Sequence, residues 1–329
     1  MDTVDQEVLK QLSHWLKEDK VCWLATIVRT FSSSPRPVGS LMALTKCGNQ
    51  VGSLSGGCVE EELTRNLVEN NKPMPPTLFK FGINSEESAR LGLPCGGQME
   101  ILVEHIKSNL LYHQHIQQLL NNIDKHQCIS REVSLTTGEV QHFAATPEQR
   151  LKNCITLSGS SFQHVLGPAF SLIIVGANQV ARYLAEFALA LNYRVLICDP
   201  RPEAISNFHL KGAETFQQMP DDFILQQKPN QQYAIVTVTH DPKIDDLALI
   251  EALASDAFYV GAMGSSRTAA ARRNRLLNMA LVELTEQQLD KLHAPVGLSI
   301  GSKTPPEIAL SIMAELTRLR SHHIEDKKG

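Results

Sequence analysis

The spacing of apolar residues divides the chain into two halves. In the second half, four apolar runs of strand length alternate with helical stretches; the runs are SLIIVG, YRVLICD, YAIVTVTH and AFYVGAM. Apolar strands separated by helices are typical of a parallel sheet that is covered on both faces and joined by right-handed crossovers. The pattern therefore predicts a Rossmann-like, doubly wound α/β domain, to which we assign residues 166–329.

The first half mixes helices with short strands. An amphipathic N-terminal helix is predicted by one helical stripe of apolar residues, Val4, Val8, Leu12, Trp15 and Leu16. Strands are expected in VCWLATIVRT, TLFKFGI and MEILVEHI, with hairpins around residues 46–49 and within REVSLTTGEVQHFAA. VEEELTRNLVEN predicts a helix directly after Cys58. Residues 1–165 are therefore assigned to a mixed α+β domain.

Two further local signals concern helix starts and histidines. Thr304, Pro305 and Glu307 form a capping-box pattern that predicts the start of the last helix. The histidines of the less regular region do not have the order of metal ligands, and we expect them on a solvated face; they are His105, His113, His115 and His126.

Composition and charge argue against a nucleic-acid-binding, a membrane-spanning or an exported protein. A length of 329 residues suits two domains, and a formal charge of −4 gives no general attraction to nucleic acid. No apolar run approaches the roughly 20 residues of a membrane span, and the polar N-terminus has no signal-peptide core. We expect a cytoplasmic protein that binds neither nucleic acid nor membrane.

Two of the seven cysteines are flanked by glycines. The odd number makes a disulfide framework improbable, and no CxxC or HExxH pattern indicates zinc. Cys22 and Cys198 lie in apolar runs and are predicted to be buried strand residues. Cys58 follows Gly-Gly and precedes a helix, while Cys95 precedes Gly-Gly.

A cysteine at a helix start feels the positive end of the macrodipole, which favours the thiolate. Glu60–Glu62 oppose this effect because they add negative charge to the same helix start. Thiols without side chains in front of them suit a soft metal, a persulfide or an electrophile. The alternative is that Gly-Gly makes a tight turn and each cysteine fills a small apolar hole.

Two glycine-containing turns follow predicted strands of the second half. Gly176, Asn178 and Ala181 align with G-x-G-x-x-G/A, and Asp199 stands where an acidic residue meets a ribose. Asn178 replaces the middle glycine but tolerates a left-handed backbone, so the turn is expected to survive. The turn either binds a nucleotide or anion, or keeps its shape without a dinucleotide.

The second turn, residues 261–267, follows the fourth strand. Ligands of such sheets bind beyond the carboxyl ends of the strands, so this turn is expected to share a crevice with Gly176 and with His240-Asp241. Arg267 suits a phosphate, although a surface arginine on a tight turn is an equal alternative.

The chain resembles the XdhC/CoxI family of xanthine dehydrogenase accessory proteins. The resemblance covers nearly the whole chain, weakens between residues 107 and 167, and is most specific in SGGCVE, GAMGSSRT and PVGLSIGSKTPPEIA. The family pattern has Gly-Ala-Gly in the first turn, so Asn178 is a departure.

The resemblance implies an accessory protein of chaperone type rather than an enzyme. Such a protein binds the molybdenum cofactor, as molybdopterin or its dinucleotide form. It protects the cofactor during sulfuration by a cysteine desulfurase and delivers it to a molybdenum hydroxylase apoenzyme of the xanthine dehydrogenase type. The resemblance also favours a homodimer. Two alternatives stay open, an NAD(P)-dependent oxidoreductase and a cofactor-free adaptor between hydroxylase and sulfurase.

On this hypothesis Cys58 faces the molybdenum or its sulfur, and Cys95 is a second metal ligand or a supporting residue. A site between the two domains, shielded from solvent, would suit an oxygen-sensitive cofactor. The expected cofactor-binding residues are Ser55, Gly56, Gly57, Cys58, Cys95, Gly96, Gly97, Gly176, Ala177, Asn178, Asp199, His240, Asp241, Gly261, Met263, Gly264, Ser265, Arg267 and Lys303.

Overall fold

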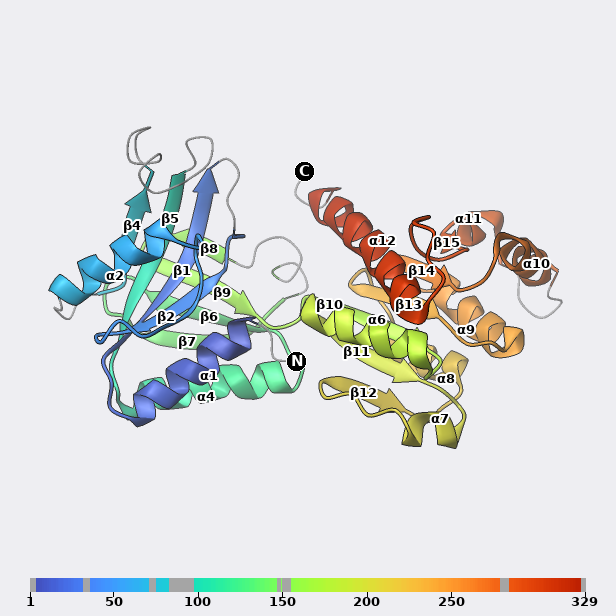
Figure 1. The fold of residues 1–329 in the computed structure, drawn as a ribbon, viewed down its shortest axis with the longest axis horizontal. Coiled ribbons are helices and arrows are strands. Elements are labelled where there is room, and N and C mark those ends of the chain that lie inside the picture. The colour runs from blue at the N-terminus through green and yellow to red at the C-terminus, as the bar shows by residue number, and fades with distance from the viewer. Residues whose placement is uncertain are drawn as a thin grey trace. The chain divides into compact units, whose positions relative to one another are not determined.

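A computed structural model describes residues 4–31, 36–70, 75–82, 98–146, 149, 155–278 and 284–326. The chain forms two compact units, of which one ends at Gly167 and the other begins at Pro168. Figure 1 shows the first unit in blue to green and the second in yellow-green to red.

The N-terminal unit is built on a five-stranded antiparallel sheet with the order β3-β2-β1-β5-β4. Its strands are β1 (Cys22–Phe31), β2 (Leu41–Thr45), β3 (Gln50–Gly52), β4 (Thr77–Phe81) and β5 (Gln98–Ile106). The β2–β3 hairpin confirms the turn predicted around residues 46–49. The long β1–β5 pairing places these two strands at the centre of the unit.

A second, four-stranded antiparallel sheet has the order β7-β6-β9-β8. Its strands are β6 (Ile129–Ser134), β7 (Val140–Ala144), β8 (Ile155–Ser158) and β9 (Ser161–Leu166). The described helices of this unit are α1 (Val4–Lys17), α2 (Cys58–Asn70) and α4 (Leu110–Asp124). α1 and α4 lie side by side (Figure 1) and share a core with the five-stranded sheet. The predicted N-terminal helix is thus confirmed, although Val4 of its stripe is half exposed.

The C-terminal unit is a parallel sheet with the order β12-β11-β10-β13-β14-β15. Its strands are β10 (Phe170–Val175), β11 (Tyr193–Cys198), β12 (Ala213–Phe216), β13 (Tyr233–Thr237), β14 (Tyr259–Ala262) and β15 (Leu292–His293). The chain moves outward from β10 in one direction and then from β13 in the other. The predicted Rossmann-like, doubly wound sheet is confirmed, and its strand order reverses between β10 and β13.

Helices cover both faces of this sheet. They are α6 (Gln179–Ala190), α7 (Pro202–Ser206), α8 (Pro220–Gln227), α9 (Pro242–Ala254), α10 (Ser266–Leu277), α11 (Glu286–Leu289) and α12 (Pro305–Asp326). α8 and α9 share one apolar core with alternate residues of the strands. α6 and α12 lie side by side (Figure 1), and their buried leucines are not part of that core, so they pack on the other face. The start of α12 at Pro305 confirms the predicted helix boundary.

The prediction of solvated histidines is wrong for His115. This residue is 6% exposed because the inner face of α4 packs against the unit, and its Nδ1 lies 2.6 Å from Nε2 of His142 on β7. Arg131, which is paired with the buried Glu104, stands between His142 and His164 in the strand register. Burial and then the Arg131 charge lower the pKa of His115 to about 2 and that of His164 to about 3.

These buried neutral histidines predict that the N-terminal unit loses stability in mild acid. Their folded pKa values lie below the unfolded value, so between these limits the unfolded chain binds more protons and stability falls as pH drops below about 6.5. Going from pH 7 to pH 5 should cost up to about 2 kcal/mol for each such histidine. The variant His115→Phe should lose about that much of the pH dependence. Urea unfolding followed by tryptophan fluorescence measures it, because both tryptophans, Trp15 and Trp23, belong to this unit.

His14→Gln is the matched control, since His14 is an exposed histidine of the same unit. Its stability should follow the same pH curve as the parent. If the free energy of unfolding of His115→Phe varied with pH as it does in the parent, His115 would not be a source of the pH dependence.

Candidate functional site

Cys58 is the first residue of α2, and its side chain is exposed. Gly56 has φ +89°, which favours glycine at this turn. A Cβ added at Gly56 or at Gly57 would meet nothing within 4 Å. The backbone before the thiol is therefore bare, and a bulky group has room to approach the sulfur.

The carboxylate of Glu60 fixes the loop that leads to Cys58. Its Oε1 accepts hydrogen bonds from Ser53 Oγ at 2.9 Å and from the backbone N–H groups of Leu54 at 2.9 Å, Ser55 at 2.7 Å and Gly56 at 2.7 Å. Its Oε2 accepts from the Gly57 N–H at 3.0 Å and from Ser55 Oγ. The residue is only 4% exposed.

Burial alone would raise the pKa of Glu60, but the hydrogen bonds of this loop outweigh burial and lower the pKa to about 2. Glu60 is thus ionised at neutral pH and supplies the negative charge that a helix start prefers. Glu61, by contrast, is exposed. Within this run, Glu60 is the glutamate that accepts from the loop of residues 53–57.

The cysteines fall into different environments. Cys22 and Cys198 are buried, as predicted, and burial raises the pKa of their thiols to about 11 and about 12. Cys47 is exposed in the β2–β3 turn. Cys95 and its neighbours Gly96 and Gly97 lie outside the described residues, so their place beside Cys58 stays a prediction.

The cavity of this unit with a volume of about 910 Å³ lies elsewhere. It is bounded by α4, by β7 and by the turn before β7, and His105, Tyr112 and His142 line it. None of the described residues of the predicted site lines this cavity. His115 and His142 of its lining feel the charge of Arg131, whereas His105 lies beside Trp23.

In the C-terminal unit, Gly176 follows β10 with φ +108°. A Cβ here would lie 2.9 Å from Cγ2 of Thr239, so glycine permits the close approach of the segment after β13. Asn178 caps α6 with an extended backbone, so the turn is formed without the left-handed conformation that asparagine tolerates. Its Oδ1 accepts from the Ala181 N–H at 3.0 Å, and its Nδ2 donates to the Val238 carbonyl at 2.6 Å.

Asp199 directly follows the neighbouring strand β11 and is buried. Its Oδ2 accepts from the Ala177 N–H at 2.8 Å and from Arg201 Nη2 at 2.6 Å, and its Oδ1 accepts from the Arg201 N–H and Nε. Burial raises the pKa of Asp199, but these contacts outweigh it and lower the pKa overall. Both oxygens of the carboxylate are therefore engaged within the chain.

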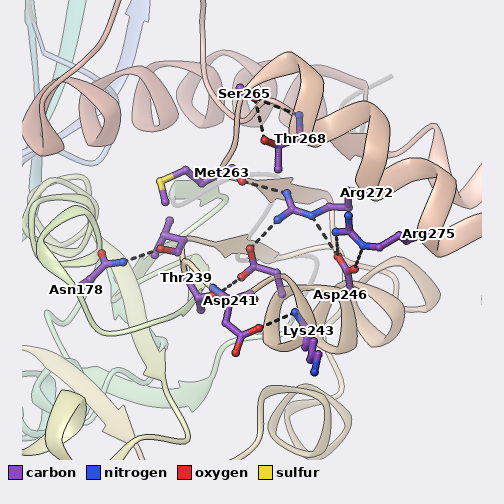
Figure 2. A network of polar contacts seen from close by, with 12 residues as sticks. Asn178, Thr239, Asp241, Lys243, Asp246, Met263, Ser265, Thr268, Arg272 and Arg275 are labelled. Atoms are coloured by element: carbon purple, nitrogen blue, oxygen red, sulfur yellow. Dashed lines mark hydrogen bonds and ion pairs between the residues drawn. The ribbon is translucent and has the colours of Figure 1, made fainter.

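A network of charged groups joins the segment after β13 to the one after β14 (Figure 2). Arg272 donates to Asp245 Oδ2 at 2.7 Å, to Asp246 Oδ1 at 3.3 Å and to the Met263 carbonyl at 3.0 Å. Arg275 adds bonds of 2.7 and 3.1 Å to Asp246. Arg272 is 2% exposed, and both aspartates are buried as well.

This network reaches the segments in which site residues were predicted. Thr239 Oγ donates to Asp245 Oδ1 at 2.7 Å and accepts from the Asp241 N–H at 3.1 Å, while Asp241 caps α9. Ser265 caps α10 by accepting from the Thr268 N–H at 3.1 Å. The polar contacts therefore fix the backbone at the starts of α9 and α10.

The remaining predicted residues of this unit divide into packed and exposed ones. Gly261 is packed, because a Cβ would lie 2.6 Å from Val296 Cγ2, and Gly264 has φ +157°. The side chains of His240, Arg267 and Lys303 are exposed. The residues that follow β10, β13 and β14 stand at the carboxyl edge of adjacent strands.

Sequence reasoning missed a polar cluster at the neighbouring strand β15. His293 Nδ1 lies 3.3 Å from Glu315 Oε1, and Tyr259 donates its hydroxyl to Glu315 Oε2 at 2.6 Å. The Gly297 N–H donates to the same oxygen at 2.8 Å. Burial raises the pKa of Glu315, but these hydrogen bonds outweigh it and lower the pKa to about 2. The motif HAPVGLSIGSKTPPEIA contains His293, yet no local pattern links it to a residue on α12.

No group of three or more His, Cys, Asp or Glu side chains in the described ranges is arranged to hold a metal ion. None of the helices in the same ranges combines the length and the hydrophobicity that a membrane span requires.

The fold and site define a two-unit protein with a Rossmann-type domain and a glycine-flanked, exposed thiol. A family model described as the XdhC Rossmann domain matches residues 172–316, and one described as the XdhC and CoxI family matches residues 15–72. Together they cover more than half of the chain, which belongs to the XdhC and CoxI family.

Individual relatives agree with this membership. The chain is 26% identical to a protein of Bacillus subtilis (strain 168) that is named as a probable subunit of xanthine dehydrogenase, over 93% of this chain and 95% of the relative. It is 25% identical to the molybdenum cofactor insertion chaperone PaoD of Escherichia coli (strain K12), over 94% of this chain and 87% of that relative. A crystal structure described as a xanthine dehydrogenase from Bacillus halodurans matches with a TM-score of 0.71 and 26% identity, over 97% of this chain and 96% of that one.

Removing Arg272 should destabilise the C-terminal unit. Arg272→Met leaves the buried carboxylate of Asp245 without its cationic partner and takes one of two arginines from Asp246, which should cost about 3–5 kcal/mol. Arg273→Met is the matched control, because Arg273 lies on the same helix but pairs with Asp290 at the surface, a contact worth about 0–1 kcal/mol. Denaturant unfolding followed by far-ultraviolet circular dichroism measures the difference. Equal losses in the two variants would contradict a central role for the network.

Proposed function

We propose that this chain is an accessory protein that binds the molybdenum cofactor, protects it during sulfuration and delivers it to an apoenzyme of the xanthine dehydrogenase type. The observation that carries the proposal is Cys58, an exposed thiol behind two open glycines at the start of α2. Family membership and the name of PaoD as an insertion chaperone support the same role.

The described residues fit this cargo. Molybdenum in its cofactor is already held by the dithiolene of the pterin, so a carrier needs no cluster of protein ligands. One soft thiolate is the donor type that suits molybdenum or its sulfur. We propose that Cys58 supplies it and that Cys95 lies beside it as a second ligand or supporting residue.

The phosphate of the cofactor is proposed to bind in the C-terminal unit. The backbone N–H groups of residues 54–57 already donate to Glu60, so that loop is a poor choice for an anion. The start of α10 offers the positive end of a helix dipole, with Arg267 exposed beside it. Lys303 is a further exposed cation, and His240, Asp241 and the turn at Gly176 complete the proposed crevice.

We propose in addition that the protein acts as a homodimer in the cytoplasm. Its partners would be a cysteine desulfurase, which supplies sulfur, and the molybdenum hydroxylase apoenzyme, which receives the cofactor. The proposed role is binding and transfer, not turnover of a metabolite.

Pterin content tests the proposal directly. The chain is expressed in a host that makes molybdenum cofactor, purified without oxygen, and assayed for pterin after oxidation to the fluorescent derivative. We expect near-stoichiometric pterin in the parent. The pterin content of Cys58→Ser should be lower than that of the parent by a factor of about ten or more, since loss of a supporting residue alone typically costs 10- to 100-fold in metal affinity.

Cys47→Ser is the control, because Cys47 is an exposed thiol of the same unit outside the proposed site. It should retain as much pterin as the parent. Equal pterin in parent and Cys58→Ser would remove Cys58 from the site. Folded, anaerobic parent protein without pterin would overturn the carrier role and favour the adaptor, which predicts capture of hydroxylase and sulfurase without a cofactor.

A second candidate is an NAD(P)-dependent oxidoreductase, which the strand order of the C-terminal unit favours. Two contacts oppose it. The side chain of Asn178 caps α6 at the position where a dinucleotide-binding turn has a glycine, whose bare backbone approaches the pyrophosphate. The carboxylate of Asp199, which would meet the ribose, already accepts hydrogen bonds from Arg201 and from the Ala177 N–H.

We therefore expect an NADH titration, followed by nucleotide fluorescence, to show no saturable binding up to about 1 mM, a limit equivalent to roughly −4 kcal/mol. Saturation at micromolar NADH, lost in Asp199→Ala, would support the oxidoreductase instead.

A further inference from the structure

The cavity of about 910 Å³ in the N-terminal unit has the size and the lining of a small-molecule site. Ligand pockets typically enclose about 300–1,000 Å³ and combine apolar walls with a few convergent polar groups. Residues of α4 and β7 (Figure 1) line two sides of this cavity, and the turn before β7 lines a third. Because none of the described residues of the proposed cofactor site lines it, its ligand would bind apart from Cys58.

The walls of the cavity offer flat surfaces to a planar ligand. Its lining includes the rings of Tyr112, His142, Pro75 and Pro76. The turn at Gly138 brings two of these rings together, because a Cβ there would lie 3.5 Å from Pro76 Cδ and 3.9 Å from the Tyr112 hydroxyl. Rings of this kind stack favourably on flat aromatic ligands, so the walls favour a planar ring system.

Side-chain amides supply hydrogen-bonding groups on two sides. Gln114 and Gln118 of α4 and Gln141 of β7 line the cavity, and within the described ranges their side chains have no hydrogen-bond partner. A carboxamide donates and accepts at once, so it matches a heterocycle edge in which an N–H group adjoins a carbonyl. Since amides face the cavity from both elements, the matching ligand has such polar atoms on more than one edge.

A pair of histidines adapts to either kind of hydrogen-bonding partner. His115 Nδ1 lies 2.6 Å from His142 Nε2, which leaves His142 Nδ1 for a ligand. Burial, and then the charge of Arg131, lower the pKa of both rings, so both are neutral at pH 7. Two neutral imidazoles share one proton in their contact. His142 Nδ1 therefore donates in one tautomeric state of the pair and accepts in the other.

The charges around the cavity favour a neutral ligand. Lys107 and Glu139, the charged side chains of its described lining apart from the histidines, have opposite signs. Arg131, which acts on the histidine pair, is itself paired with the buried Glu104. An ion would lose its hydration here without meeting a surplus of opposite charge, which is costly.

We propose that this cavity binds a neutral fused-pyrimidine heterocycle, the ring system that oxopurines and pterins share. The rings of the ligand stack on the walls, and its amide-like edges bind Gln118 and the histidine pair. The inference goes beyond the proposed function and does not rest on it, because neither Cys58 nor the C-terminal unit takes part.

Equilibrium dialysis tests this with two free compounds, hypoxanthine as the oxopurine and biopterin as the pterin. The full chain is purified from a host that makes no molybdenum cofactor, so that no cargo competes. We expect a Kd of about 10–100 μM for at least one compound, which ligands of roughly ten to twenty non-hydrogen atoms reach. The tighter of the two identifies the source of the ring system. Nicotinate, which is planar but anionic, should bind about tenfold more weakly or worse.

The diagnostic variants are Gln118→Leu and His142→Phe. Each keeps a side chain of similar size and removes hydrogen-bonding groups that face the cavity, so the Kd should rise about tenfold. Circular dichroism checks that both variants are folded. If His142→Phe does not fold, Gln118→Leu carries the test, because Gln118 is exposed on α4.

Gln117→Leu is the matched control. Gln117 precedes Gln118 on the same helix, but it does not line this cavity, and its amide donates to Asn121 Oδ1 at 3.0 Å. The Kd of this variant should stay within about twofold of the parent, as expected for a surface substitution outside the site.

Three outcomes would overturn the inference. They are no binding of either compound up to about 1 mM, a Kd that Gln118→Leu leaves unchanged or Gln117→Leu raises equally, and nicotinate binding as tight as that of the heterocycles. Pterin content is a separate measurement. A parent without pterin defeats the proposed carrier role but not this site, and a cavity that binds neither compound leaves the role of Cys58 untouched.

Discussion

Carboxylates of the chain itself hold the glycine-containing turns of both units. Glu60 accepts from the loop before α2, Asp199 accepts from the Ala177 N–H, and Glu315 accepts from the Gly297 N–H. A buried N–H group without a partner is costly, and a glycine-rich turn exposes several of them in a small space. An internal carboxylate satisfies these groups permanently, so each turn has a defined shape before any ligand arrives.

This constraint changes which groups are available for binding. Glycine-rich turns suggest phosphate cradles because their N–H groups converge on one point. Where a carboxylate already occupies that point, a ligand must be recognised mainly by side chains. Exposed side chains of the predicted site are those of Cys58 in the N-terminal unit and of His240, Asp241, Ser265, Arg267 and Lys303 in the C-terminal unit.

The accuracy of sequence reasoning here depends on how local each interaction is. Alternating apolar runs predicted the parallel sheet, and Thr304 with Glu307 predicted the start of α12, because both signals lie within a few residues. Glu60 stands three residues after Gly57 and accepts the Gly57 N–H, so the same capping rule applies at the start of α2. From the sequence we considered only the negative charge of Glu60. Contacts between distant segments are different. Tyr259 meets Glu315 across 56 residues, and the packing of α4 buries His115, which no local pattern reveals.

The capping geometry also explains why the start of α2 suits a functional thiol. In a capping box, the residue before the helix and the third helical residue satisfy each other's backbone and side-chain groups, and the first helical residue takes no part. At α12 that first position is Pro305. At α2 it is Cys58, and there only the Glu60 half of the box is present, because Gly57 has no side chain to accept a bond. The loop that presents Cys58 is held by Glu60, and the core beneath it is made by other residues of α2 and the sheet. The thiol is thus positioned by a structure that does not depend on it, which leaves its side chain to a ligand.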